Sequence, residues 1–293
     1  MKIKDSLGVK IFQIFNYILL TLLCVVTLYP IIHVVMASFS DGDALMAHTG
    51  VLLKPAGFST AAFEMILKDG RLFQCYGNTI YICCVSLVIN MVLTSVAAYV
   101  TTRKELIGRG VIMKLILVTM YFGGGLIPTY MCIKDLGLLD SHMALILPGA
   151  IGTYNMIVLR TAFISIPESL YEAARIDGAG HLKIMFRIML PLAKATLAVI
   201  ALYYLVGHWN AWFGASIYLT TPSKYPLQLY LRNTLIQNDT NMAGEMMLDV
   251  DKKAISETLK YAIIVVSTVP VLCVYPFLQK YFAKGVMVGA VKG

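Results

Sequence analysis

Charged residues are scarce in this chain, and this scarcity excludes an ordinary soluble domain. They make up 14% of the 293 residues, whereas hydrophobic residues make up 58% and the mean hydropathy is +0.75. Soluble domains carry about 25% charged residues. Six stretches of 19 or more residues contain no charged side chain: 11–40, 72–102, 115–133, 141–159, 195–223 and 261–279. A helix of that length crosses the ~30 Å hydrocarbon core, so the sequence predicts an all-α, polytopic membrane protein with six transmembrane helices.

A single transmembrane domain over residues 1–293 accommodates these helices, with outer loops at 38–74 and 220–257. We expect the first helix to be retained, because its apolar run is too long for a cleavable signal peptide. Gly123–Gly125 and Pro128 predict a bend in the third helix, either as a packing kink or as a gating hinge. The predicted helices cover about 13–37, 75–101, 111–132, 142–163, 191–219 and 258–281.

Motifs for catalysis, nucleotide binding and metal binding are also missing from the sequence. There is no Gly-x-x-x-x-Gly-Lys loop, no His-Glu-x-x-His and no Gly-x-Ser-x-Gly. Without a Cys-x-x-Cys pair or a His cluster, the cysteines are expected to be free thiols buried as small hydrophobic residues. We therefore expect a chain that is not an enzyme, binds no metal or cofactor, and leaves any ATP site to another chain. The six cysteines are Cys24, Cys75, Cys83, Cys84, Cys132 and Cys273.

Basic residues are distributed unequally between the two sides of the predicted membrane. The side that holds both termini and the 160–194 stretch carries 15 of the 24 Lys and Arg and 5 of the 16 acidic residues, an excess of +10. The other side carries 9 basic and 11 acidic residues, an excess of −2. By the positive-inside rule, both termini and residues 160–194 are expected to be cytoplasmic. The net charge of +8 is thus a topology signal, and no basic stripe suggests nucleic-acid binding.

The cytoplasmic segment 165–190 lies between the fourth and fifth predicted helices. Ser165 and Glu168 have capping-box spacing and predict a helix start. Gly178 is expected to end that helix in a left-handed conformation, and Pro191 to open the next. These features alone fit an interfacial helix-turn-helix between two spans or a coupling helix that a soluble partner pushes.

The spacing of this segment resembles the EAA loop of ABC importer permeases. Glu172-Ala173-Ala174 is followed by Gly178 and then by Ile188 and Leu190-Pro191. Leu136-Gly-Leu138 with Asp140, Trp209-Asn210-x-Trp212 and the tail 284–293 also resemble the carbohydrate-uptake class, which includes the smaller permease of the maltose importer. The stretch 225–233 resembles the subgroup for complex or acidic oligosaccharides, such as alginate or aldouronate importers.

The resemblance implies a type I ABC importer permease fold in the bacterial cytoplasmic (inner) membrane. It implies a second permease, two ATPase subunits that bind ATP and Mg, and an extracytoplasmic solute-binding protein. In the family, the loop contacts the ATPase and transmits rigid-body rocking that gives alternating access. The implied ATPase-coupling residues are Glu172, Ala173, Ala174, Asp177, Gly178, Ala179, Ile188, Leu190 and Pro191, and the ATPase-contacting tail residues are Gly289, Lys292 and Gly293.

A sugar path needs hydrogen-bonding groups and aromatic faces. Trp209 and Trp212 are three residues apart, which predicts a shared helix face if the helix is continuous. The alternatives are an interfacial aromatic belt for the tryptophans and interhelical hydrogen bonds for the polar groups. The candidate path residues are Tyr204, His208, Trp209, Asn210, Trp212, Asn90, Tyr154 and Asn155.

The residues of the loop also leave other functions open. A permease for peptides, amino acids or phosphate would share the loop. An autonomous secondary transporter or a polytopic membrane enzyme would not need it. The autonomous secondary transporter is disfavoured because no carboxylate lies inside the predicted spans to couple protons or sodium.

Overall fold

The structure is a computed structural model that describes residues 6–68, 70–244, 257–270 and 272–273. Within these residues every regular element is helical, and the only β contact is an isolated bridge between Ser40 and Phe58. The all-α prediction is therefore confirmed for the part described. The chain divides into two compact units, residues 1–70 with 233–269 and residues 71–232 with 270–293.

Two described helices are long and apolar enough to cross a bilayer by themselves, α1 (Leu7–Ser38) and α4 (Gly70–Thr102). Two further pairs qualify if each bent pair is taken as one span. The helices α5 (Arg109–Tyr121) and α6 (Leu126–Asp135) meet at 112°, and the stretch His181–Leu192 meets α12 (Lys194–Trp209) at 86°. The predicted bend near Gly123–Gly125 is confirmed, since Gly125 adopts φ +86°, which favours glycine.

Two predicted helices are interrupted in the structure. Instead of one helix over 142–163 there are α7 (Met143–Ile146) and α8 (Thr153–Ile164). Pro148, Gly149 and Gly152 fall between them, and the 12 residues of α8 rise only about 18 Å. Instead of one helix over 191–219, α12 ends at Trp209 and α13 (Phe213–Tyr218) follows. The last predicted helix, 258–281, lies partly outside the described residues.

The first unit contains α1, a loop with two short helices, and a helical stretch at 257–269. The short helices are α2 (Gly42–Ala47) and α3 (Ala61–Lys68). The Asp41 carboxylate caps α2 by accepting from the backbone N–H groups of Asp43 and Ala44. In this unit His33 on α1 makes an edge contact with Tyr261, with ring centroids 5.8 Å apart.

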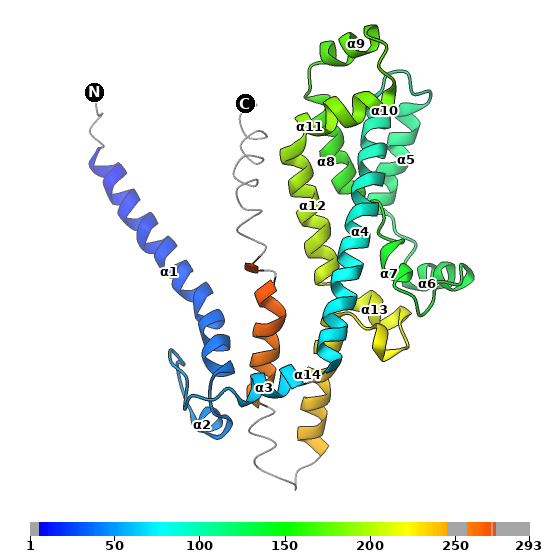
Figure 1. Ribbon diagram of the computed structural model, residues 1–293. Helices are drawn as coiled ribbons and strands as arrows, with labels where there is room; N and C mark the ends of the chain where they lie inside the picture. Colours follow the sequence, from blue (N-terminus) through cyan, green and yellow to red (C-terminus); the bar gives the residue numbers. More distant parts are fainter. Residues whose placement is uncertain (1–5, 69, 245–256, 271, 274–293) are drawn as a thin grey trace. The chain divides into compact units, whose positions relative to one another are not determined.

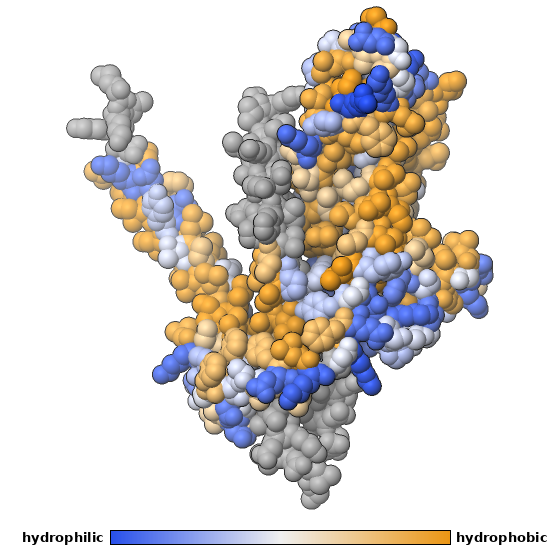
Figure 2. All heavy atoms as spheres, in the orientation of Figure 1, coloured by the Kyte–Doolittle hydropathy of each residue, from blue (hydrophilic) through white to orange (hydrophobic). Residues whose placement is uncertain are grey.

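The second unit is a bundle in which α5 and α12 both pack against α8, beside α4 (Figure 1). Figure 2 shows apolar side chains covering these helices and polar ones gathered at the end that carries α9 (Glu168–Ile176). The short elements there are α10 (His181–Ile184), the π-helix η1 (Met185–Met189) and α11 (Leu190–Leu192). The 3₁₀-helix η2 (Pro222–Lys224) follows α13, and α14 (Leu227–Gly244) follows it and crosses the boundary between the units.

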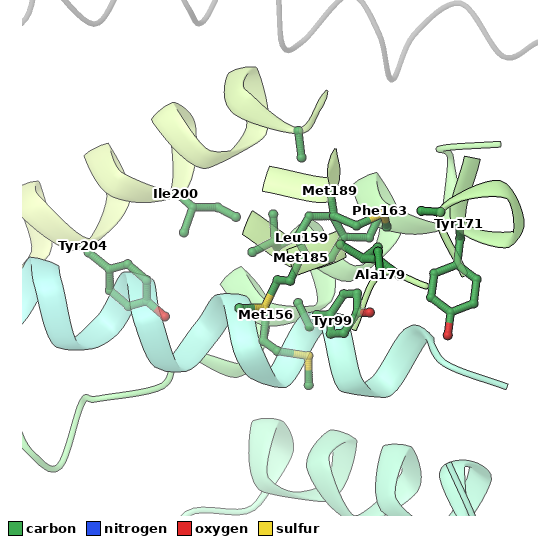
Figure 3. Packing of buried hydrophobic residues seen from close by; sticks show 14 residues of the cluster. Tyr99, Met156, Leu159, Phe163, Tyr171, Ala179, Met185, Met189, Ile200 and Tyr204 are labelled. Carbon is green, nitrogen blue, oxygen red and sulfur yellow. The ribbon is translucent and has the colours of Figure 1, made fainter. Parts of the chain in front are cut away.

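One buried cluster joins this end to the bundle, and Figure 3 shows its side chains. It takes side chains from α4, α8, α9, α10, η1 and α12. Because it is continuous, the short helices at the bundle end are packed onto the long ones. Its members are Ala98, Tyr99, Met156, Leu159, Phe163, Tyr171, Ala174, Ala179, Ile184, Met185, Met189, Ala193, Ile200 and Tyr204.

Candidate functional site

The helix α9 has one face packed inward and one face open. Tyr171 and Ala174 are three residues apart, share a face, and are 8% and 9% exposed. Glu172, Ala173 and Arg175 on the other face are exposed. The outer face of α9 is thus available to a partner, while the inner face belongs to the core.

The helix start differs from the prediction. Ser165 does not cap α9: its hydroxyl donates to the Ala162 carbonyl at 2.7 Å, because α8 continues to Ile164 and Ser165 lies at its end. Pro167 occupies the N-cap position of α9 instead. Glu168 lies in the first turn, where a negative charge is favourable, and accepts from Lys104 Nζ at 2.6 Å.

The helix end agrees with the prediction. Gly178 adopts φ +75°, and its N–H donates to the Arg175 carbonyl at 3.0 Å. The Ala179 N–H donates to the Ala174 carbonyl at 2.9 Å. These two bonds form a Schellman motif, in which the left-handed residue is normally glycine. Ala179 packs into the core with Ala174, so the turn is fixed to the bundle.

The predicted coupling residues do not all face outward. Ala174 and Ala179 are buried, which leaves Ala173 as the exposed alanine of the motif. Ile188 and Leu190 are half-buried against the core cluster. The exposed members are Glu172, Ala173, Asp177, Gly178 and Pro191. The tail residues Gly289, Lys292 and Gly293 lie outside the described residues.

Pro191 helps to explain the π-helix η1 before it. Proline has no N–H, so the Arg187 carbonyl loses the donor that a regular α-helix would supply. The helix widens over Met185–Met189 and then breaks at Ala193, the N-cap of α12. Pro191 therefore lies inside the stretch His181–Leu192, which meets α12 at 86°, and not at the start of a continuous fifth helix.

Two large apolar side chains at this end were not identified from the sequence. Ile176 closes α9 and is 86% exposed, and Leu182 on α10 is 70% exposed. They flank the Gly178 turn, where their exposure leaves both side chains available to a partner. Their signal in the sequence is weak, because only the turn geometry reveals that both point away from the core.

A stacked arginine holds α9 against the loop that follows α4. The Arg103 guanidinium lies 4.2 Å from the centre of the Tyr171 ring and 4.9 Å from that of Tyr99. The Tyr171 hydroxyl donates to Glu105 Oε1 at 3.1 Å. A backbone hydrogen bond and this hydroxyl hold the pKa of the Glu105 carboxyl below its usual range. The inner face of α9 is therefore fixed by cation–π, hydrogen-bonding and apolar contacts.

Among the candidate path residues, the structure brings Asn90 beside His208 and Tyr204 beside Thr94, in two polar contacts between α4 and α12. Tyr204 Oη lies 2.7 Å from Thr94 Oγ1 and accepts from the Gly152 N–H at 2.8 Å. Asn90 Nδ2 lies 3.2 Å from His208 Nε2. These bonds join α4 to α12, so the alternative of interhelical hydrogen bonding applies to Tyr204 and to the amide nitrogen of Asn90, whose Oδ1 has no partner among the described residues.

The tryptophans do not share a helix face, because the helix ends between them. Asn210 is the C-cap of α12, and its side chain donates to the Val206 carbonyl at 2.9 Å. Trp209 lies beside Tyr76, with ring centroids 6.4 Å apart, whereas Trp212 stacks with Arg232 at 4.0 Å. Two path residues remain: Asn155 is buried, and Tyr154, next to it, is exposed.

At the opposite end of the second unit, Asp140 joins two loops. Its carboxylate accepts from the N–H groups of Thr220 and Thr221, both at 2.9 Å, and from Lys224 Nζ at 2.7 Å. Asp140 has φ +54°, so the surrounding bonds hold a backbone conformation that is rare outside glycine. Lys224 and the donors from Thr221 and Thr220 lower the pKa of Asp140 far below its usual range.

Asp140→Asn is expected to open this pair of loops. A carboxyl with a lowered pKa stabilises the closed form above its unfolded pKa, and that contribution is lost as the pH falls through the folded value. The wild type should therefore keep its loops closed from neutral pH down to mildly acidic pH. In the variant, hydrogen exchange of the Thr220 and Thr221 amides should be several-fold faster already at neutral pH. Equal exchange in both proteins would show that the charge is not what joins the loops.

Known proteins resemble this chain over nearly its whole length. The family model described as "binding-protein-dependent transport system inner membrane component" matches residues 11–288. The chain is 40% identical over 285 residues to the polygalacturonan/rhamnogalacturonan transport system permease protein YtcP of Bacillus subtilis, covering 97% of this chain and 99% of the relative. It is 29% identical to the diacetylchitobiose uptake system permease protein NgcG of Streptomyces coelicolor, covering 95% and 88%. A crystal structure of a bacterial ABC transporter involved in the import of the acidic polysaccharide alginate contains a similar chain, with a TM-score of 0.86, 34% identity, and coverage of 96% and 100%.

Proposed function

Because this chain belongs to the family of binding-protein-dependent transport system inner membrane components, we propose that it is one of two permease subunits of an ATP-driven oligosaccharide importer. The chain is not an enzyme, since ATP hydrolysis in such systems takes place on a partner. The partners are a second permease, two ATPase subunits that bind ATP and Mg, and an extracytoplasmic solute-binding protein. This chain binds no cofactor of its own.

The membrane topology that we propose has six crossings with both termini in the cytoplasm. The two long helices and the two bent pairs supply four crossings, and the charge-free runs at 141–159 and 261–279 supply the others. The excess of Lys and Arg on the side of residues 160–194 supports a cytoplasmic α9.

One observation carries the mechanism: the inner face of α9 is part of the bundle core. Tyr171 and Ala174 lie in the same buried cluster as Tyr99 of α4 and Phe163 of α8 (Figure 3). Close-packed interiors transmit displacement with little deformation. We propose that the ATPase contacts the outer face, through Glu172, Ala173 and Asp177, and moves α4 and α8 with α9. Such rigid-body movement gives alternating access.

The substrate class that we propose is the oligosaccharides, with uronic-acid oligosaccharides as the first candidates. The relatives named above transport polygalacturonan, rhamnogalacturonan and diacetylchitobiose, and the similar solved chain belongs to an alginate importer. His208, Asn90 and Trp209 are the candidate path residues that we retain. Trp209 Nε1 and Asn90 Oδ1 are buried and have no hydrogen-bond partner within the described residues, so each has one hydrogen bond left to make.

Uptake by the complete complex in proteoliposomes tests this function. We expect labelled galacturonate or alginate oligosaccharides to enter only with internal ATP and an external binding protein. A neutral peptide or an amino acid should not enter. Entry of a non-sugar solute under the same conditions would reassign the substrate class. Uptake by this chain alone, without ATP, would contradict the proposal.

A further inference from the structure

A pocket of about 230 Å³ is lined by residues from the end of α4, the start of α5, the end of α8 and the start of α9. Four of its lining side chains are cationic: Arg103, Lys104, Arg109 and Arg160. The mechanism described above uses only Arg103, as the partner of Tyr171. All lining residues belong to the second unit.

The pocket holds more positive than negative charge. Glu168 is the only carboxylate that lines it, and Lys104 pairs with it at 2.6 Å. Within the described part of the chain, no ion pair joins a carboxylate to any of the three arginines. Three guanidinium groups therefore line one cavity, and the carboxylate that lines it is paired with Lys104.

The arginines are held in place by the end of α4. Arg160 Nε donates to the Thr101 carbonyl at 3.3 Å, and an Arg109 terminal nitrogen donates to the Thr102 carbonyl at 3.4 Å. Arg103 donates to Thr102 Oγ1 from two nitrogens, at 3.0 and 2.9 Å. Helix-end carbonyls attract cations, which explains why the arginines gather here. A guanidinium carries more N–H donors than these bonds use, so donors remain for a further acceptor.

We propose that this pocket binds the phosphate of an anionic phospholipid headgroup. Guanidinium groups match phosphate oxygens in geometry and pair with them in a bidentate manner. A bound phosphate would offset the repulsion between the three arginines. It would also place an anion beneath Arg103, the residue that stacks on Tyr171 of α9.

The apolar surroundings favour a lipid over free phosphate. Phe163, Ile164 and Pro167 also line the pocket, and Ile164 is 55% exposed. The helix α5, which begins at Arg109, continues with the exposed apolar residues Val111 and Leu115, along which acyl chains can lie. The proposal rests on the proposed function in one respect: it needs these helix ends at the cytoplasmic membrane surface, where anionic lipids concentrate.

Lipid retention by the purified, complete complex tests the site. The complex is exchanged into nanodiscs of phosphatidylcholine with a minor fraction of phosphatidylglycerol, and retained lipids are counted by native mass spectrometry. The double variant Arg109→Gln/Arg160→Gln is expected to bind phosphatidylglycerol about 25-fold more weakly, at about fivefold per charge removed. Lys114→Gln, which removes a cation of α5 outside the pocket, should retain the lipid like the wild type.

Further measurements decide whether the pocket binds a lipid headgroup, free phosphate or a protein partner. The charge-retaining pair Arg109→Lys/Arg160→Lys keeps the charge but loses the bidentate geometry, so it should bind phosphatidylglycerol more weakly than the wild type and more tightly than the glutamine variant. If the glutamine variant does not fold, equal binding by the lysine pair and the wild type would overturn the proposed bidentate arginine–phosphate contact. Millimolar inorganic phosphate should not displace the lipid, and displacement would assign a free-phosphate site. If the glutamine variant loses the ATPase subunit but retains as much lipid as the wild type, the pocket belongs to a protein partner. Equal retention in the glutamine variant and the wild type would overturn the proposal. Because lipid is counted without transport or ATP, failed uptake would leave this result standing.

Discussion

Gly178→Val is expected to weaken the association of this chain with its ATPase partner, and ATP-driven uptake, about tenfold or more. Gly178 adopts φ +75°, a conformation that costs about 1–2 kcal/mol for an ordinary L-residue and more for a β-branched one. A Cβ at this position meets nothing within 4 Å, so the effect comes from the backbone and not from a clash. Loss of the left-handed turn removes the two Schellman bonds and shifts Ile176 relative to Leu182. The fraction of molecules able to dock should fall about tenfold or more.

Two variants serve as controls for this change. Gly178→Asn should retain most activity, because asparagine tolerates the left-handed region. Gly180→Ser adds a side chain at the neighbouring exposed glycine, which has φ −72° and is the N-cap of α10, where serine is favoured. ATPase co-purification and ATP-driven uptake are measured for all three. Equal behaviour of Gly178→Val and Gly180→Ser would show that the turn conformation has no role in docking.

Leu182→Asp is expected to weaken ATPase association about 10- to 150-fold. Leu182 is exposed in the isolated chain, and burial of a leucine side chain at an interface is worth about 1.5–3 kcal/mol. A carboxylate at the same position would also have to lose its hydration. Leu182→Met, which keeps an apolar side chain of similar volume, should bind like the wild type. Affinity is measured by titrating the purified ATPase subunit onto the permease pair in nanodiscs.

If the aspartate variant binds the ATPase as tightly as the methionine variant, the Leu182 side chain faces lipid or another subunit. The same comparison at Ile176 then decides whether any apolar part of the α9 end takes part in docking.

The sequence was sufficient for those parts of the fold that depend on local composition. The charge-free runs predicted α1 and α4, because an uninterrupted apolar helix of that length has few alternatives. The glycines at 123–125 predicted the break between α5 and α6. Gly178 predicted the end of α9, because the left-handed turn depends mainly on the glycine itself.

Other features depended on tertiary contacts and could not be predicted. Ser165 matched a capping box, but α8 extends far enough to place it at a helix end. The break at Asn210 was hidden inside a charge-free run, and it moves Trp212 off the helix that holds Trp209. The inward orientation of Ala174 depends on which face of α9 meets Phe163 and Tyr99, and motif spacing carries no information about that.

The pocket lined by Arg103, Lys104, Arg109 and Arg160 could not be predicted from the sequence either. Arg103 and Lys104 are distant in sequence from Arg160, and the sequence presented them only as topology signals at helix ends. Their convergence depends on α8 returning beside the end of α4. The charge pattern that predicts cytoplasmic orientation thus also supplies a binding site.

Site-specific photo-cross-linking in the native host tests the central claim, that the outer face of α9 contacts the ATPase. A photoreactive amino acid is placed at Ile176, which is exposed, and separately at Tyr171, which is buried in the same helix. The account predicts a cross-link from position 176 to an ATP-hydrolysing chain, and cross-links from position 171 only within this chain. Cross-linking of position 176 solely to lipid or to the second permease, with the ATPase present in the complex, would contradict it.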